Sequence, residues 1–374
     1  MGALRAVAVA AGVVIVLYDL TDLVRALIVP RPYTGGIVAL TTRALRRLGE
    51  RIAMSRRDYE TRDRALAVVE PVIMVVRLGL WVAIGFLGFA LLLWGVGHRP
   101  FVHALVESGS SLTTLGFANE PGTVSAAVSF LAAAFGLVVI ALQIAYLPAL
   151  YEAFNRREVL VTMLESRAGT PAWGPELLAR HYLVGIEGNL AELYSEWERW
   201  SADVAESHTT YPILLRLRSP HATNSWVVAL VSVLDSAALY LALCPRLAPA
   251  EARLCVRMGF TCLRDIARVI RIPFDPDPRP DAPIELGYDD FLDAVRRLER
   301  AGVPLERTPE AAWPEFRGWR VNYESVAYAL ADLVYATAAP WTGPRTAHVE
   351  AVVSPLRPTH RSPEQPEGDP VARA

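Results

Sequence analysis

The sequence contains no lysine, and all 37 of its basic residues are arginine. Schiff-base catalysis and the lysine of a phosphate-binding P-loop are therefore excluded. The net charge is -2, so a basic surface for nucleic acid is not expected. The three cysteines are too few for a disulfide framework and do not have the spacing of a metal site. We expect no cofactor and no nucleic-acid partner.

Charged residues are also scarce, at 20% of the 374 residues, whereas hydrophobic residues reach 53%. Soluble domains usually carry about 25% charged residues. The apolar excess is concentrated in a few long runs. This composition predicts an all-α membrane protein with a water-soluble part.

Three apolar runs are long enough to cross a bilayer as helices. The first, from about residue 6 to residue 29, defines an N-terminal segment 1–30. A secretory signal is its alternative, but no small-residue cleavage site follows the run. The second and third runs cover 71–97 and 124–150. A fourth run, 226–243, carries Asp235 near its middle, which is costly in lipid, so a buried helix of a soluble domain is favoured there.

The distribution of arginine predicts the orientation. Segment 31–68 holds nine arginines and four acidic residues, whereas 98–123 holds a single arginine, Arg99. The positive-inside rule places 31–68 and the chain after about residue 151 in the cytoplasm, and the N-terminus and 98–123 outside. The expected location is the plasma membrane, with several passes.

The arginine-rich segment 31–68 is predicted to be a cytoplasmic amphipathic linker. Arginines lie opposite one apolar helix face, which is formed by Ile37, Leu40, Ala44, Leu45, Leu48 and Ile52. A basic amphipathic helix beside a membrane attracts anionic lipid headgroups, and we assign this role to 36–64. A solvated connector that only enforces topology is the alternative.

The remainder of the chain, 151–343, is predicted to be a helical cytoplasmic domain, and 344–374 a disordered tail rich in proline and arginine. The helices are expected over 175–205, 225–244, 248–270, 288–301 and 311–338. No alternating strand pattern and no glycine-rich nucleotide loop stands out. His208, Asp203 and Ser207 have the residue types of a nucleophilic triad but no nucleophile elbow, so an enzyme is not expected.

Between the second and third runs lies a segment that is too apolar for an ordinary loop. Residues 101–112 can form three turns of helix, and the chain continues with Thr113, Thr114, Leu115, Gly116, Phe117, Ala118 and Asn119. This order of helix, re-entrant segment and helix within 69–150 resembles the two-transmembrane pore-loop potassium channel family of the bacterial type. The filter signature of that family reads T-T-V-G-Y-G-D.

The resemblance, over roughly residues 70–155, implies a pore helix at 101–112 and a selectivity filter at 113–119. In such a filter, potassium or another monovalent cation replaces its hydration shell with backbone carbonyls, here those of Thr114, Leu115, Gly116 and Phe117. Glycine at 116 permits backbone angles that side chains disfavour. The chain departs from the signature at Asn119, which lacks a carboxylate, and at Ala118, where strain is expected if the position needs positive φ.

One filter strand per chain cannot close a ring, so the resemblance implies a homotetramer whose third span lines the pore. Gly136 and Pro148 are candidate gate hinges in that span, with helix packing and helix termination as alternatives. The predicted function is a tetrameric, potassium-conducting cation channel with a cytoplasmic regulatory domain. The alternative is a non-conducting membrane scaffold or sensor that retains a degenerate pore fold.

Arg77 places a charge inside the second run. Intramembrane charges usually mark a functional site or have a partner. Asp19 and Asp22, near the cytoplasmic end of the first run, are expected at a matching depth. We predict an intramembrane ion pair between Arg77 and one of these carboxylates, which holds the first span to the pore.

Overall fold

The computed structural model describes residues 2–29 and 36–344, and every regular element in these ranges is a helix. The chain divides into two compact units. Unit 1 comprises residues 1–55 and 65–152, and unit 2 comprises residues 56–64 and 153–374. The tail predicted over 344–374 lies outside the described residues, apart from Pro344.

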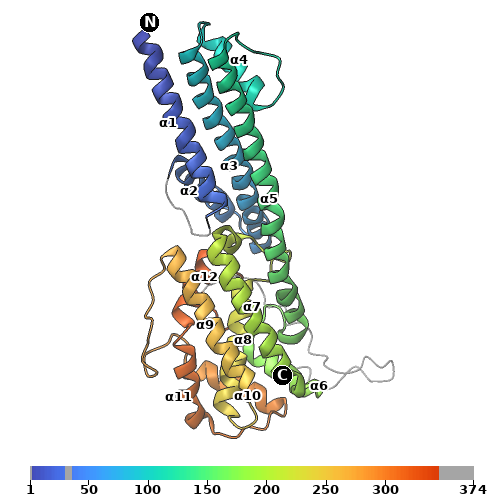
Figure 1. The fold of residues 1–374 in the computed structure, drawn as a ribbon. Coiled ribbons are helices and arrows are strands. Elements are labelled where there is room, and N and C mark those ends of the chain that lie inside the picture. The colour runs from blue at the N-terminus through green and yellow to red at the C-terminus, as the bar shows by residue number, and fades with distance from the viewer. Residues whose placement is uncertain (1, 30–35, 345–374) are drawn as a thin grey trace, which may run out of the picture. The chain divides into compact units, whose positions relative to one another are not determined.

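Unit 1 contains the three predicted spans. Its helices are α1 (Gly2–Leu27), α2 (Gly36–Met54), α4 (Phe101–Leu112) and most of α3 (Tyr59–Val96) and α5 (Thr123–Ala168). Helices α1, α3 and α5 run side by side (Figure 1). All three are long and apolar enough to cross a membrane, and only 28% to 33% of their apolar windows is buried. Their large exposed apolar faces are those of an all-α membrane protein.

Glycines allow α1 and α3 to approach closely. A Cβ atom added at Gly12 would lie 2.8 Å from the carbonyl oxygen of Gly88. A Cβ atom added at Gly88 would lie 2.8 Å from the side chain of Val16. Small residues at such contacts are typical of transmembrane helix pairs, because they bring the two backbones within van der Waals distance.

The arginine-rich segment contains a helix break that the sequence analysis did not predict. Helix α2 ends at Met54 and α3 begins at Tyr59, so 36–64 is not one helix. Asp58 caps α3, because its carboxylate accepts hydrogen bonds from the Thr61 N–H at 2.8 Å and the Thr61 hydroxyl at 2.5 Å. Arg46 then holds α2 to α3 through a bidentate ion pair with buried Glu70, at 2.6 and 2.9 Å.

Unit 2 is a bundle of helices around α8 (Trp226–Leu243). The helices that pack on α8 are α6 (Gly174–Val184), α7 (Leu190–Thr210), α9 (Ala250–Ile270), α11 (Pro309–Arg320) and α12 (Glu324–Leu333), and α10 (Tyr288–Arg300) packs on α6 and α11. Helix α8 is apolar enough to cross a membrane, but 94% of it is buried. It has almost no surface left for lipid, which supports its interpretation as a core helix.

Two of the helices predicted in this region are each divided in two. The stretch 175–205 is divided by Gly185, which has a φ of 71° and ends α6. The stretch 311–338 is divided into α11 and α12. A left-handed glycine after the last helical residue is a common stop signal, and the sequence analysis did not use it at Gly185.

Asp235, the charge inside α8, has partners within unit 2. Arg320 of α11 donates a hydrogen bond to its carboxylate, and the Tyr323 hydroxyl donates another at 2.6 Å. Arg320 also donates to Glu324 at 2.6 Å and to the carbonyl of Trp341 at 2.6 Å. Asp235 and Arg320 are both fully buried, so this network removes the cost of a lone charge in the core.

A second buried network joins the end of α5 to α7. Arg157 of α5 is 0% exposed and donates to the carbonyls of Leu214 and Leu217 at 2.7 and 2.8 Å. Its guanidinium also lies 3.1 Å from Nε2 of His208, which is equally buried. Burial, followed by the charge of Arg157, holds the pKa of His208 well below its ordinary value. The ring is therefore neutral in the folded protein.

We expect the protein to lose stability as the pH falls below about 6.5, the ordinary pKa of histidine. The unfolded chain binds a proton at residue 208 in this range, whereas the folded chain does not, so acid favours unfolding. This residue contributes a loss of about 1.4 kcal/mol per pH unit. His181, whose pKa burial also lowers, contributes in the same direction. Denaturant unfolding of the purified chain from pH 7 to pH 5 measures the slope.

Two variants separate this effect from general acid sensitivity. His208→Gln should have a smaller slope than the parent, because the amide does not titrate. His221→Gln changes an exposed histidine and should keep the parental slope. Equal slopes in the parent and in His208→Gln would contradict the prediction.

Candidate functional site

The candidate site is the segment between α4 and α5. Helix α4 has the bounds predicted for the pore helix, and residues 113–119 follow it without a helix or strand. Helix α5 begins at Thr123, directly after Pro121 and Gly122. The order of helix, irregular segment and long apolar helix is therefore present in the structure.

The backbone N–H groups of this segment turn back toward α4. The carbonyl of Ser110 accepts hydrogen bonds from the N–H of Leu115 at 2.8 Å and of Gly116 at 3.3 Å. The Ser110 hydroxyl accepts a third from the N–H of Ala118 at 3.1 Å. Within the described residues, the carbonyls of 113–118 accept no hydrogen bond. The N–H groups of residues 113–116 and 118 are thus bound to α4, whereas the carbonyls of 113–118 are free.

Two residues of the segment have left-handed backbone angles, Thr114 with a φ of 58° and Gly116 with a φ of 71°. Ala118 does not have a positive φ, so the strain expected at this position is absent. The strain lies at Thr114, because a β-branched residue rarely adopts this conformation.

The side chains of the segment are open to the surface of the single chain. Leu115 is 69% exposed and Phe117 is 70% exposed. Thr113, Gly116 and Asn119 are exposed as well. No other part of the described chain covers these residues.

Contacts with α3 and α5 position α4. The Ser108 hydroxyl donates to the carbonyl of Phe86 in α3 at 2.8 Å. Buried Glu107 accepts a hydrogen bond from Ser129 of α5 at 3.0 Å. Ser108, Ser110 and Glu107 were missed by the sequence analysis. The signal for Glu107 was an acidic residue within an apolar segment.

The last residue of α4 packs against Gly136 of α5. A Cβ atom added at Gly136 would overlap the carbonyl of Leu112. The glycine therefore has the packing role that the sequence analysis left open. Helix α5 continues through both Gly136 and Pro148 to Ala168, so Pro148 does not end the helix. A hinge at either residue stays a prediction.

The C-terminal side of the segment is tied to α3 and α1. The carboxylate of Glu120, which is nearly buried, accepts a hydrogen bond from the N–H of His98 at 2.7 Å. Arg5 of α1 donates to the carbonyl of Gly97 and, at 3.1 Å, to that of His98. Glu120 was not singled out from the sequence.

The direct ion pair predicted for Arg77 is not formed among the described residues. The guanidinium lies over the ring of Trp81, 5.0 Å from its centroid, and the Trp81 indole donates to Asp22 at 2.9 Å. Trp81 therefore contacts both charged groups. Asp19 is fully buried, and neither of its oxygens has a hydrogen-bond partner in the described chain.

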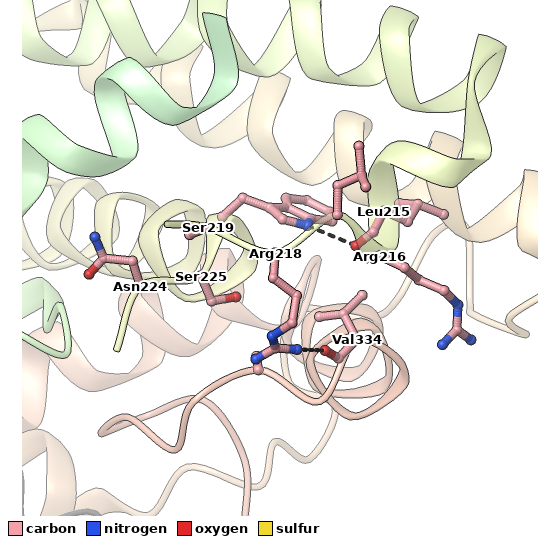
Figure 2. Close-up of a pocket in the computed structure, with 10 residues that line it drawn as sticks. Leu215, Arg216, Arg218, Ser219, Asn224, Ser225 and Val334 are labelled. Atoms are coloured by element: carbon pink, nitrogen blue, oxygen red, sulfur yellow. Dashed lines mark hydrogen bonds between the residues drawn. The ribbon is translucent and has the colours of Figure 1, made fainter. Parts of the chain in front are cut away.

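Helices α3 and α5, which come before α4 and after the segment, also extend into unit 2. There the stretch 212–218 contacts each of them, because Leu214 and Leu217 accept from Arg157 of α5, while Arg218 donates to Asp63 and, at 3.1 Å, to the Tyr59 hydroxyl of α3. Figure 2 shows Arg218 at a small pocket, with its guanidinium bound to the Val334 carbonyl at 2.7 Å.

The residue types of a nucleophilic triad meet only in part. The Ser207 hydroxyl lies 3.1 Å from Nδ1 of His208, but Nε2 of that ring faces Arg157. The carboxylate of Asp203 lies 3.1 Å from Arg156 instead of binding the histidine.

Comparisons of the chain with protein-family models, with curated proteins and with solved structures gave no match. Its function must be argued from its own geometry.

We expect Gly136→Ala to disturb the candidate site, because the new methyl group would overlap the Leu112 carbonyl and separate α5 from α4. Overpacking of this kind costs about 1–3 kcal/mol. Thermal unfolding in detergent measures the loss.

Gly79→Ala is the matched control, since an added Cβ atom at this helical glycine of α3 meets nothing within 4 Å. It should unfold at the parental temperature or slightly above, because alanine favours a helix. Equal destabilisation by both changes would contradict the packing role of Gly136.

Proposed function

We propose that the chain forms a homotetrameric, potassium-conducting channel with residues 113–119 as its selectivity filter. The observation that carries this proposal is the hydrogen bonding of the segment. The N–H groups of residues 113–116 and 118 are bound to α4, and the carbonyls of 113–118 accept no hydrogen bond in the described chain. A filter requires such carbonyls, because they replace the hydration shell of the ion. Those of Thr114, Leu115, Gly116 and Phe117 are the proposed potassium ligands.

The surroundings of the segment support this role. Irregular backbone is tolerated at membrane depth only where protein buries it or where it lines water. One chain leaves Leu115 and Phe117 exposed, and a ring of four chains would supply the missing cover. The C-terminal end of α4 lies next to the segment, and its partial negative charge favours a cation.

Ala118, which stands where the family signature has glycine, is more compatible with potassium selectivity than the sequence alone suggested. Its φ is not positive, and Ser110 holds its N–H. The substitution therefore needs no distortion of the segment. An ordered segment holds its carbonyls at fixed positions, which selectivity requires.

We assign unit 2 to the cytoplasm and to regulation of the pore. The orientation is inferred from arginine, which is more frequent in 31–68 than in 98–123, because cytoplasmic segments are enriched in positive charge. The contacts of 212–218 with both α3 and α5 supply a physical route, since a shift of this stretch would act on the helix before α4 and on the helix after the filter.

The test is potassium flux into liposomes that contain the purified protein. Gly116→Ala should abolish flux, because alanine at a φ of 71° costs about 1–2 kcal/mol per chain and turns a carbonyl away from its position. Ser110→Ala should weaken selectivity for potassium over sodium, whereas Ser110→Thr keeps the hydroxyl and should behave like the parent.

The control is Gly79→Ala, and size-exclusion chromatography checks that every variant keeps the parental oligomer. A parental tetramer without cation flux would favour the alternative, a scaffold or sensor with a degenerate pore fold. Parental flux in Gly116→Ala would contradict the assignment of the filter.

We also propose that α2 lies along the membrane surface and binds anionic lipid headgroups. The apolar side chains of Ile37, Leu40, Leu48 and Ile52 are all more than 50% exposed, while Val38 and Ala53 on another face are buried. Four large exposed apolar residues do not suit a solvated connector. Arg43, Arg47 and Arg51 are exposed beside them, where headgroup phosphates would lie.

We expect the anionic lipid phosphatidylglycerol, but not the zwitterionic phosphatidylcholine, to raise the melting temperature of the parent. Changing Arg43, Arg47 and Arg51 together to glutamine should remove this rise, because each arginine near an anionic membrane surface contributes about 1 kcal/mol of binding free energy. The matched control changes three exposed arginines of unit 2, Arg246, Arg253 and Arg257. Loss of the lipid effect in both triple variants, or in neither, would contradict the proposal.

A further inference from the structure

Two acidic side chains of α1 are buried at its contact with α3. Asp19 and Asp22 are 0% and 3% exposed, and their spacing of three residues puts them on one face of the helix. Asp22 contacts Trp81 of α3. A Cβ atom added at Gly85, one turn further along α3, would lie 3.3 Å from Oδ2 of Asp19. The missing side chain at Gly85 thus leaves room for the Asp19 carboxyl group.

Asp22 has groups that compensate an ionised carboxylate. It accepts a hydrogen bond from the Trp81 indole at 2.9 Å, and the positive charge of Arg77, which lies over that ring, attracts it. The negative charge of Asp22 and the positive charge of Arg77 balance across Trp81.

Asp19 has no oppositely charged partner and no side-chain donor in the described chain, and the backbone of Gly85 is the group that favours its ionised form. Both of its oxygens are buried without a hydrogen-bond donor. The charged group that acts on it is Asp22, which has the same sign. The α5 neighbour at Gly85 is the apolar ring of Phe135. Tyr146, Arg46 and Glu70 act electrostatically on Arg77 and are not among the groups that act on Asp19.

An ionised carboxylate without a donor is far more costly to bury than a neutral carboxyl group. A metal ion would need several oxygen or nitrogen ligands, and no cluster of three or more acidic, histidine or cysteine side chains occurs in the described residues. A proton needs no further ligand.

We propose that Asp19 is a proton-binding site of unit 1, and that its carboxyl group carries a proton while α1 packs against α3. Release of the proton would place a second negative charge beside Asp22 and oppose this packing. The contact between α1 and α3 is therefore linked to proton concentration. Helix α1 lies outside the helix–segment–helix module, so this site does not depend on the filter assignment.

Infrared spectroscopy of the purified full chain tests the proposal directly. At pH 7 the spectrum should contain the C=O stretching band of a protonated carboxylic acid that Asp19→Asn removes and Asp22→Asn retains. A spectrum that Asp19→Asn leaves unchanged would overturn the proposal. Disappearance of the band in Asp22→Asn alone would assign the proton to the other carboxylate and would overturn it as well.

Unfolding at different pH values gives a second, independent measurement. Asparagine has the shape of a protonated aspartate, so Asp19→Asn should fold, and failure to fold would contradict the proposal. As the pH rises from the ordinary carboxyl range near pH 4 to neutral pH, the parent should become less stable relative to Asp19→Asn. The ratio of folded to unfolded protein should fall by up to tenfold per pH unit. Asp265→Asn, at a partly exposed ion pair of unit 2, is the control and should follow the parent. A difference between Asp19→Asn and the parent that does not change with pH would overturn the proposal.

Discussion

The hydrogen bonds that Ser110 accepts determine the path of the chain between α4 and α5. The last carbonyls of a helix have no partner inside it, and irregular backbone has N–H groups that need acceptors. In this protein, Ser110 at the end of α4 accepts hydrogen bonds from the N–H groups of Leu115, Gly116 and Ala118. The carbonyls of the segment then remain available, which is the feature that the channel proposal uses.

This arrangement depends on an exact position of α4, and several contacts provide it. Gly136 allows α5 to approach the Leu112 carbonyl, and buried Glu107 binds α5 through Ser129. Glu120 binds the backbone at the end of α3 on the other side of the segment. The segment is held from three directions, so its free carbonyls do not result from a loose loop.

Arginine supplies the buried cations on which unit 2 depends. Arg157, Arg218 and Arg320 each bind two or more groups from separate parts of the chain. The guanidinium presents five donors in a planar fork, so one side chain can bind carbonyls and carboxylates at the same time, whereas lysine offers a single nitrogen. Arginine in place of lysine therefore allows a single buried side chain to bind the free carbonyls of helix ends and loops.

The sequence by itself determined the elements that depend on local signals. The lengths of the apolar runs predicted α1, α3 and α5 as helices long enough to span a membrane, the bounds of α4 followed from residues 101–112, and glycine at 116 indicated the left-handed backbone found there. Only the tertiary structure decided which groups meet across the chain. Trp81 contacts both Arg77 and Asp22, Ser110 accepts hydrogen bonds from N–H groups of the segment, and Asp235 of α8 pairs with Arg320, 85 residues further along. Such pairs leave no periodic pattern, because the free energy of a buried charge or an irregular backbone depends on neighbours that only folding brings into contact.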